Sequence, residues 1–258
     1  MSNKNLAQMG GAKVHLGEFA GQQCIVKHEA SDVEIAFYTH AYGHLDGVNT
    51  PKLLHQENRT LFLEYIPTSI DLAELVNQEE TFRQLASIHS ADADQGFLFK
   101  RHQWTSKDTL RALDHLSLPS GANRHLLDFS AQSYELFSHH GMISGDSNSG
   151  NWGKRLNGEL VLFDWERFGC ASPAIDLAPL VKGLGTEEDY RQIIAQYRMF
   201  NSHLSEAQLI RHLVLAKAWI IVEVTNLLTQ RRKPEAAKFI DWYRSNAPSW
   251  LASVEHLL

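Results

Sequence analysis

The segment that most constrains this chain spans residues 143–164 and reads ISGDSNSGNWGKRLNGELVLFD. Two short apolar runs, one ending at the start of this segment and one at residues 160–163, each lead into a carboxylate, Asp146 and Asp164. Asn151 follows Asp146 by five positions. Short apolar runs bounded by turn residues are typical of short buried strands. We therefore expect two strands that carry two acids and an amide to one polar site.

The residue types of this segment favour phosphate chemistry. Carboxylate and amide oxygens are ligands that Mg²⁺ prefers, and a carboxylate beside Mg²⁺-bound phosphates can hold a hydroxyl nucleophile. Taken singly, the same residues have ordinary explanations. An Asp-x-x-x-x-Asn pattern is common in loops, and an aspartate such as Asp164 after an apolar run is typical of a turn. The functional interpretation depends on what the rest of the chain supplies.

The composition is that of a globular chain that can form one large domain or two smaller ones. Of its 258 residues, 43% are hydrophobic and 21% are charged, so a buried core is well supplied. It carries 24 Lys and Arg against 30 Asp and Glu, a net charge of −6. That balance argues against a nucleic-acid surface, because phosphate-backbone binders need a basic face. The acidic excess suits a cationic small substrate, although solubility is the commoner explanation.

Cysteine usage and the lack of targeting signals favour the cytoplasm. Cys24 and Cys170 are far apart and outside metal-ligand spacing, so we expect no disulfide framework and a reducing compartment. The N-terminal residues lack the apolar core of a signal peptide. The most apolar run, residues 218–222, is too short to span a bilayer. The histidines are scattered without an H-x-x-x-H pair, so no histidine metal site is indicated.

The first 66 residues predict a small lobe of two hairpins and one helix. Residues 12–16 and 22–27 alternate in β-like pieces on either side of a glycine turn. Residues 52–56 and 60–64 flank a polar turn and form the second hairpin. The proline that ends residues 65–67 breaks the strand, because proline cannot continue a β-ladder.

Further residues of this lobe suit a nucleotide. Gly10 and Gly11 stand just before the first strand, where backbone without side chains can approach phosphate oxygens, although such a pair usually marks a turn. The second strand ends on Lys27. Ser31 and Glu34 have the spacing of a helix-capping box. Glu34 therefore either caps the helix, which spacing alone favours, or points back to pair with Lys27.

The remainder of the chain has mostly helical periodicity. Apolar residues recur at spacings of three and four from Leu209 to Leu227, which predicts a long helix with Ser205 as its N-cap. Thr186 begins the preceding helix in the same way, and Pro234 ends the linker into a last helical stretch. No repeat or low-complexity segment is present, so we expect the two lobes to form one catalytic unit.

The segment around Asp146 resembles the catalytic loop of the aminoglycoside phosphotransferase and choline kinase-like family, which shares the protein-kinase fold. That loop is usually H-G-D-x-x-x-x-N, and here it reads SGDSNSGN at residues 144–151. The metal-binding segment matches as FDWE at residues 163–166, followed by the family's D-L-A at residues 176–178. The likeness is strong over residues 141–180 and looser in the small lobe.

The resemblance implies a role for each candidate residue. Asp146 would be the catalytic residue that orients the acceptor hydroxyl, and Asn151 and Asp164 would bind Mg²⁺. Lys27 would contact the α and β phosphates of ATP while Glu34 holds it in place. The nucleotide-binding set would be completed by the glycine pair and by the hinge whose backbone contacts adenine, that is Gly10, Gly11, Glu64 and Ile66.

Two positions depart from the family pattern. The histidine that usually opens the loop is Ser144, and the second frequent histidine is Asn148. The first of these histidines normally packs behind the metal site, so its replacement bears on the rigidity of the loop and leaves the reacting groups intact. Asp176 is expected to be structural, accepting backbone N–H bonds that fix the catalytic loop.

We therefore predict an α+β, two-lobed protein-kinase-like fold, with a β-rich N-lobe at residues 1–66 and a larger helical C-lobe at residues 67–258. The resemblance implies an ATP- and Mg²⁺-dependent phosphotransferase that acts on a hydroxyl of a small molecule: an aminoglycoside, a choline-like amine, an amino alcohol or a sugar. A protein substrate is disfavoured, because only about ten residues separate Asp164 from Pro173, too few for a peptide-docking loop.

Two other interpretations stay open at this point. A kinase-like nucleotide- or ligand-binding protein with weak catalysis would fit Ser144 and the sparse glycine loop. A metal-dependent hydrolase that uses Asp146 and Asp164 would leave Lys27 and the hinge unexplained. No nucleic-acid or membrane partner is expected, and the oligomeric state stays open.

Overall fold

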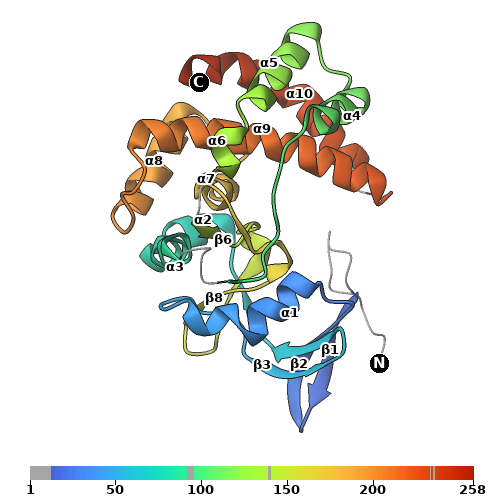
Figure 1. Ribbon diagram of the computed structural model, residues 1–258, viewed down its shortest axis with the longest axis vertical. Helices are drawn as coiled ribbons and strands as arrows, with labels where there is room; N and C mark the ends of the chain where they lie inside the picture. The colour runs from blue at the N-terminus through green and yellow to red at the C-terminus, as the bar shows by residue number, and fades with distance from the viewer. Residues whose placement is uncertain (1–12, 92–95, 139–140, 233, 235) are drawn as a thin grey trace. The chain divides into compact units, whose positions relative to one another are not determined.

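The computed structural model divides into two compact units, each described here by itself. Unit 1 consists of residues 1–101 and 140–170, and unit 2 of residues 102–139 and 171–258. The β-sheets belong to unit 1, and unit 2 is helical (Figure 1). The boundary expected between residues 66 and 67 lies within unit 1 and stays a prediction about the lobes. The structure describes residues 13–91, 96–138, 141–232, 234 and 236–258.

Unit 1 contains a four-stranded antiparallel sheet with the order β1–β2–β4–β3. The strands make up the two expected hairpins: β1 (Lys13–Phe19), β2 (Gln22–His28), β3 (Leu53–Glu57) and β4 (Thr60–Glu64). The first hairpin turns at Ala20 and Gly21 and the second at Asn58, all with positive φ. Two-residue hairpin turns require this left-handed backbone, because its twist matches that of the strands.

Helix α1 (Asp32–Thr39) follows β2 and packs against the short 3-10 helix Trp165–Arg167, directly after Asp164. Its N-cap is Ser31, whose hydroxyl accepts a hydrogen bond from the backbone N–H of Glu34 at 3.1 Å. The other half of the expected capping box is absent, because the carboxylate of Glu34 pairs with Lys27. The ring of Phe37 stacks on Trp165, with ring centroids 3.9 Å apart, which fixes α1 in this position.

The two short apolar runs of the sequence form the expected buried strands. β6 (Met142–Ile143) pairs with β9 (Gly169–Cys170). β8 (Leu160–Leu162) pairs with β7 (Trp152–Lys154), which also pairs with β5 (Thr68–Ser69). The side chains of β6 and β8 are at most 2% exposed, which explains their uninterrupted apolar sequence. The helices α2 (Leu72–Val76) and α3 (Glu79–Ser90) of unit 1 lie between β5 and β6 in the sequence.

Unit 2 is organised around the helix α9 (Glu206–Gln230), which contacts every other α-helix of this unit (Figure 1). Those helices are α4 (Ser106–Leu116), α5 (Ser120–Ala131), α6 (Tyr134–Phe137), α7 (Ala174–Leu177), α8 (Glu187–Arg198) and α10 (Ala236–Val254). The predicted N-caps of α8 and α9 are confirmed: Thr186 and Ser205 each close a capping box. Each box satisfies backbone N–H groups that the first helical turn leaves without partners.

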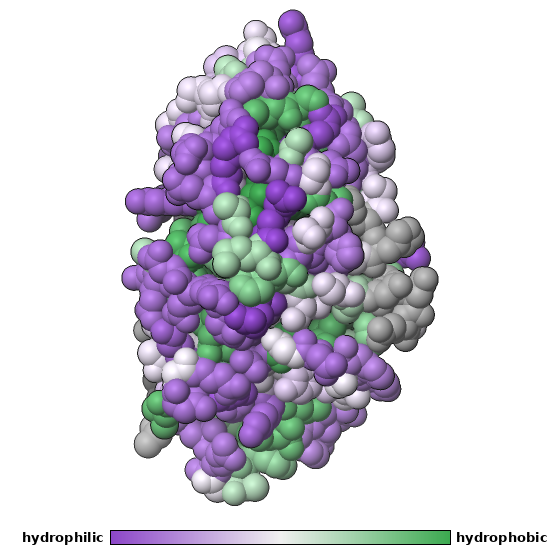
Figure 2. Space-filling model, turned by 90° about the vertical axis from the view of Figure 1, so that its left-hand side faces the viewer, coloured by the Kyte–Doolittle hydropathy of each residue, from purple (hydrophilic) through white to green (hydrophobic). Residues whose placement is uncertain are grey.

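The length of α9 follows from its position in the core of unit 2. The apolar run at residues 218–222 is the centre of this longer helix, which by length and composition alone could cross a membrane. However, 72% of its most apolar window is buried inside the protein. A helix that is apolar on most sides is expected where other helices surround it. The face drawn in Figure 2 is mostly hydrophilic, with hydrophobic residues in small patches between polar ones.

Candidate active site

A buried lysine between two carboxylates forms the centre of the site. The ammonium nitrogen Nζ of Lys27, in β2, lies 2.7 Å from Oε2 of Glu34 in α1 and 2.7 Å from Oδ1 of Asp164, which follows β8. Lys27 is 6% exposed and Glu34 is fully buried, whereas the side chain of Asp164 is 33% exposed. In the folded protein, the candidate residues Glu34 and Asp164 therefore both contact the candidate Lys27.

Burial and charge act in opposite directions on this lysine. Burial lowers the pKa of the Lys27 ammonium, but the carboxylates of Glu34 and Asp164 outweigh burial, so the pKa rises above its ordinary value. Burial raises the pKa of the Glu34 carboxyl, and the attraction of Lys27 opposes that rise. Lys27 is therefore a cation at neutral pH.

Asp164 has a backbone conformation that is uncommon outside glycine. Its φ of 68° and ψ of 69° lie in the left-handed region. Such conformations cost of order 1–3 kcal/mol and gather at functional sites. The conformation turns the chain from β8 into the short 3-10 helix Trp165–Arg167, with the Asp164 carboxylate on Lys27.

The hairpin of β7 and β8 places Asn151 beside Phe163, the residue before the second acid. Trp152 pairs with Leu162, and the N–H of Phe163 donates to the carbonyl of Asn151 at 2.9 Å. The side-chain Nδ2 of Asn151 donates to the carbonyl of Asp146 at 2.8 Å. The amide oxygen of Asn151 is then the atom with which this side chain can bind a metal ion.

The start of the candidate catalytic loop is held by a serine and an arginine where the family pattern has a histidine. Ser144 is 3% exposed, and its hydroxyl accepts a hydrogen bond from the N–H of Asp146 at 3.4 Å. Gly145 has a φ of 79°, and an added Cβ would collide with the carbonyl oxygen of Arg167. Arg167 Nε in turn donates to the carbonyl of Gly145 at 2.8 Å. The side chain of Arg167 thus fixes the loop together with Ser144.

The second departure from the family pattern contacts the catalytic candidate directly. Asn148 Nδ2 donates to Oδ1 of Asp146 at 2.7 Å, while Asn148 Oδ1 accepts from the N–H of Gly150 at 2.9 Å. The indole Nε1 of Trp152 donates to the carbonyl of Ser147 at 3.0 Å. One carboxylate oxygen of Asp146 is therefore oriented from within its own loop.

The donor set fits Mg²⁺. Within the residues that the structure describes, no group of three or more His, Cys, Asp and Glu side chains is placed to hold a metal ion. Mg²⁺ at phosphate-transfer sites needs fewer protein ligands, because phosphate oxygens and water complete its shell. Asn151 and Asp164 meet that requirement, since both offer oxygen and the Asp164 carboxylate contacts Lys27 through Oδ1 alone.

The predicted hinge follows β4 and lies against β7. A Cβ added to Gly153 would lie 2.8 Å from Cγ2 of Ile66 and 2.8 Å from the carbonyl oxygen of Thr68, so this position admits only glycine. The carboxylate of Glu64 is bound by Arg155, and the N–H of Glu64 donates to the carbonyl of Lys52 at 2.9 Å. Both the side chain and the backbone N–H of Glu64 are thus engaged by the protein itself, and the contact of this hinge with adenine stays a prediction.

The structure leaves three candidate residues untested. Gly10 and Gly11 lie outside the described residues. Asp176 lies in α7 of unit 2, where it is fully buried and raises, together with burial, the pKa of Tyr197. Its expected contact with the catalytic loop stays a prediction.

Sequence reasoning missed several residues that support the site. Arg167 and Arg155 hold the catalytic loop and the hinge, and the indole Nε1 of Trp165 donates to the hydroxyl of Thr50 at 2.9 Å. Their signal in the sequence is weak, because an arginine on a polar hairpin is ordinarily solvated and a threonine between strands is ordinarily a turn residue. Asn148 was visible as a departure from the family pattern, but its contact with Asp146 depends on the folded loop.

The fold is that of the protein-kinase-like small-molecule kinases, as the catalytic loop predicted. Choline kinase LicA from Streptococcus pneumoniae superposes with a TM-score of 0.67 and 16% identity, over 98% of this chain and 94% of that chain. A second LicA structure holds AMP. Macrolide 2'-phosphotransferase MphH from Brachybacterium faecium gives a TM-score of 0.65 and 12% identity, over 95% of this chain and 91% of that chain.

An ethanolamine kinase from Plasmodium vivax gives a TM-score of 0.58 and 11% identity, over 97% of this chain and 83% of that chain. No family model and no curated protein sequence matches this chain. At these identities the likeness concerns the fold, and the chemistry has to be inferred from the residues of the site.

Proposed function

We propose that this protein is an ATP- and Mg²⁺-dependent phosphotransferase that transfers the γ-phosphate to a hydroxyl of a small molecule. The observation that carries this proposal is the contact of Lys27 with both Glu34 and Asp164 in a protein-kinase-like fold. A hydrolase that used only two acids would not need a buried lysine held as a cation.

Lys27 would bind the α and β phosphates of ATP through its ammonium. Glu34, which is fully buried in α1, keeps that ammonium in place through its carboxylate. Asp164 and Asn151 would hold Mg²⁺, which offsets the charge of the phosphate oxygens when bound. Binding of a phosphate between Lys27 and Asp164 would replace part of their direct ion pair.

Asp146 would orient the acceptor hydroxyl for in-line attack. A partly exposed carboxylate is a weak base for an alcohol, so positioning contributes more than complete removal of the proton. Asn148 fixes Oδ1 of Asp146, and Asn151 anchors its carbonyl, so the carboxylate keeps one orientation. Such fixed geometry is what converts a bimolecular reaction into an effectively unimolecular one.

A nucleotide as phosphate donor is supported by two neighbours of the same fold. LicA has been crystallised with AMP, and an aminoglycoside phosphotransferase of this fold with ADP. The neighbours act on choline, ethanolamine, macrolides or aminoglycosides, which supports a small-molecule acceptor with a hydroxyl. Neither Cys24 nor Cys170 forms a disulfide bond, in keeping with a cytoplasmic enzyme.

The experiment that tests the proposal is a transfer assay with purified protein, radiolabelled ATP and Mg²⁺. The acceptor panel contains choline, ethanolamine, other amino alcohols, sugars, aminoglycosides and macrolides. We expect phosphate on at least one acceptor class, lost on chelation of the metal ion. The proposal is refuted if the protein shows neither Mg²⁺-dependent ATP binding nor phosphate transfer to any acceptor. Binding without transfer would favour a kinase-like binding protein, and release of phosphate without acceptor would favour a hydrolase.

Two variants separate the roles of the acids. Asp146→Ala should remove nearly all transfer and leave nucleotide affinity almost unchanged, because Asp146 acts on the acceptor. Asp164→Ala should weaken Mg²⁺–ATP binding as well as transfer. Equal and mild effects of both substitutions would mean that the roles are misassigned.

A further inference from the structure

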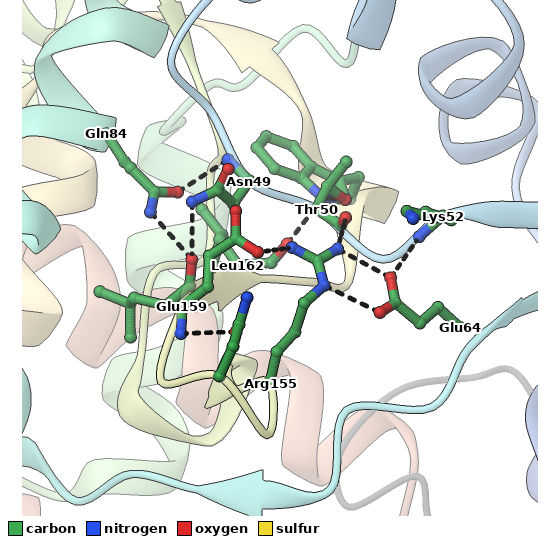
Figure 3. Close-up of polar contacts among 11 residues, drawn as sticks. Asn49, Thr50, Lys52, Glu64, Gln84, Arg155, Glu159 and Leu162 are labelled. Carbon is green, nitrogen blue, oxygen red and sulfur yellow. Dashed lines mark hydrogen bonds and ion pairs between the residues drawn. The ribbon is translucent and has the colours of Figure 1, made fainter.

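Arg155, directly after β7, binds the glutamate that ends β4. Its Nε donates to Oε1 of Glu64 at 2.8 Å and its Nη2 to Oε2 at 2.7 Å, so the guanidinium and the carboxylate meet side by side (Figure 3). Nη2 also donates to the carbonyl of Thr50 at 3.0 Å, and Nη1 to Oε2 of Glu159 at 2.8 Å. A planar guanidinium can bind a carboxylate through two parallel hydrogen bonds, whereas an ammonium cannot.

This arrangement leaves the carboxylate of Glu64 fully engaged by the protein. The N–H of Lys52 donates to Oε2 of Glu64 at 3.1 Å, in addition to the two hydrogen bonds from Arg155. Both side chains of the pair are only 17% exposed. The hydrogen bonds from Arg155 lower the pKa of the Glu64 carboxyl, so the pair stays ionised at neutral pH.

The pair joins the two sides of the candidate nucleotide site. Glu64 ends the strand from which the hinge begins, while β7, which Arg155 follows, starts directly after the metal-ligand candidate Asn151. Along its length β7 also pairs with β5, where Thr68 lies opposite Lys154. The hinge and the metal-binding hairpin are therefore connected by a strand that is fixed at its far end by Arg155.

A second connection runs through the segment before β3, also drawn in Figure 3. Asn49 accepts at its carbonyl from the N–H of Leu162 at 3.0 Å, and its Nδ2 donates to the carbonyl of Leu160 at 3.1 Å. The Nε2 of Gln84 donates to the same carbonyl at 3.0 Å. Thr50, the next residue, binds Arg155 through its backbone. The strand β8, which ends before Asp164, is thus tied to the same arginine.

Given the phosphotransfer proposed above, we infer that Arg155 is a positioning residue that couples nucleotide binding at the hinge to Mg²⁺ binding at Asn151 and Asp164. Nucleotide on the hinge and metal on the hairpin each favour the arrangement that the Arg155–Glu64 pair holds. Two ligands that stabilise one arrangement bind with a favourable coupling free energy, and each raises the affinity of the other by the same factor.

The test measures that factor in the intact protein. ADP and ATP affinities are determined by calorimetry with and without Mg²⁺ for the parent, for Arg155→Lys and for Glu64→Gln. Arg59→Lys is the matched control, because Arg59 pairs with Asp32 in the same unit but both side chains are more than half exposed. Thermal unfolding verifies that each variant is folded.

We expect Mg²⁺ to increase the nucleotide affinity of the parent. In Arg155→Lys the factor of this increase should be smaller by about fivefold or more, which is within the usual range of coupling between sites. Glu64→Gln should shrink it in the same direction, and Arg59→Lys should leave it unchanged. If the Arg155→Lys variant unfolds at lower temperature but keeps the parental coupling, the pair is merely structural and the inference is overturned.

Two outcomes keep this inference apart from the proposed function. A parent that binds no nucleotide in the presence of Mg²⁺ refutes the phosphotransfer proposal, and the inference falls with it. A parent with normal coupling and transfer, together with unaltered coupling in Arg155→Lys, refutes only the role of Arg155.

Discussion

Among the residues that the structure describes, each unit buries one lysine almost completely, and the two lysines have partners of opposite kinds. Lys27 in unit 1 is 6% exposed and contacts the carboxylates of Glu34 and Asp164. Lys217 in unit 2 is 5% exposed and donates to two backbone carbonyls, those of Val181 at 2.8 Å and Gly183 at 2.6 Å. Burial is the same, but the partners differ in charge.

The partners decide the protonation state. Burial lowers the pKa of Lys217 to about 7, with only the charge of Asp189 opposing it, whereas two carboxylates raise the pKa of Lys27. A neutral amine still has two N–H groups, which match the two carbonyls at Lys217. A buried lysine that binds phosphate has to stay charged, and this requires acids beside it. A buried lysine that only donates hydrogen bonds to backbone carbonyls does not require them.

The largest effect is expected from removal of the charged lysine. Lys27→Met leaves Glu34 buried without its cation, and breaking a buried ion pair in this way costs about 3–5 kcal/mol in free energy of unfolding, less whatever Glu34 regains by protonation. Phosphate transfer should fall by at least ~100-fold, since electrostatic contacts of this kind at transferring phosphates carry such factors. Chemical denaturation and the transfer assay measure the two effects.

A double variant separates folding from chemistry. Lys27→Met combined with Glu34→Gln removes the unpaired charge and should recover a large part of the lost stability, because the buried group is then neutral. Transfer should stay low, because the phosphates still lack their cation. Recovery of transfer along with stability would mean that Lys27 is a structural lysine like Lys217.

The second lysine predicts a smaller and purely structural effect. Lys217→Met leaves the carbonyls of Val181 and Gly183 without donors, at a cost of about 1–3 kcal/mol in free energy of unfolding. The affinity for Mg²⁺–ATP should match that of the parent, since the hydrogen-bond partners of Lys217 in the described structure are backbone carbonyls of unit 2. A fall in that affinity at unchanged stability would contradict the comparison.

The sequence predicted those features of the structure that depend on local sequence pattern. The hairpins, the capped helices and the buried strands around Asp146 and Asp164 follow from the apolar periodicity and the turn residues, and the fold class followed from the resemblance of the ordered motifs to a known family. The role of Glu34 could not be decided that way, because the spacing of Ser31 and Glu34 is that of a capping box. Only the proximity of Lys27, a neighbour in space, turns the carboxylate away from the helix end.

The contacts that support the site could not be predicted either, because their partners are neighbours in space and not along the chain. Arg155 and Glu64 are 91 positions apart, and each alone is typical of a solvated strand end. The charge state of Lys217 was likewise invisible, since a lysine on an apolar helix face usually extends to solvent. Such features depend on which backbone carbonyls and acids the fold brings near, not on spacing along the chain.

The comparison also predicts how stability depends on pH. The folded-state pKa of Lys217, about 7, lies below its unfolded value of about 10.5, so between these values the unfolded chain binds more protons and stability rises with pH. The slope is at most about 1.4 kcal/mol per pH unit. Lys27 has a raised pKa, so its contribution is fully present over this range and is lost only at higher pH.

The measurement is the difference in free energy of unfolding between the parent and Lys217→Met at pH 7.5 and 8.5. Subtraction removes the contributions of other groups, including Cys24 and the buried tyrosines, whose raised pKa values lower stability at more alkaline pH. The parent should gain about 1 kcal/mol relative to the variant over that interval. If this difference in free energy of unfolding does not change with pH, Lys217 stays charged in the folded protein. Two carbonyls would then suffice to hold a buried ammonium, and the two acids beside Lys27 would have to be explained by catalysis alone.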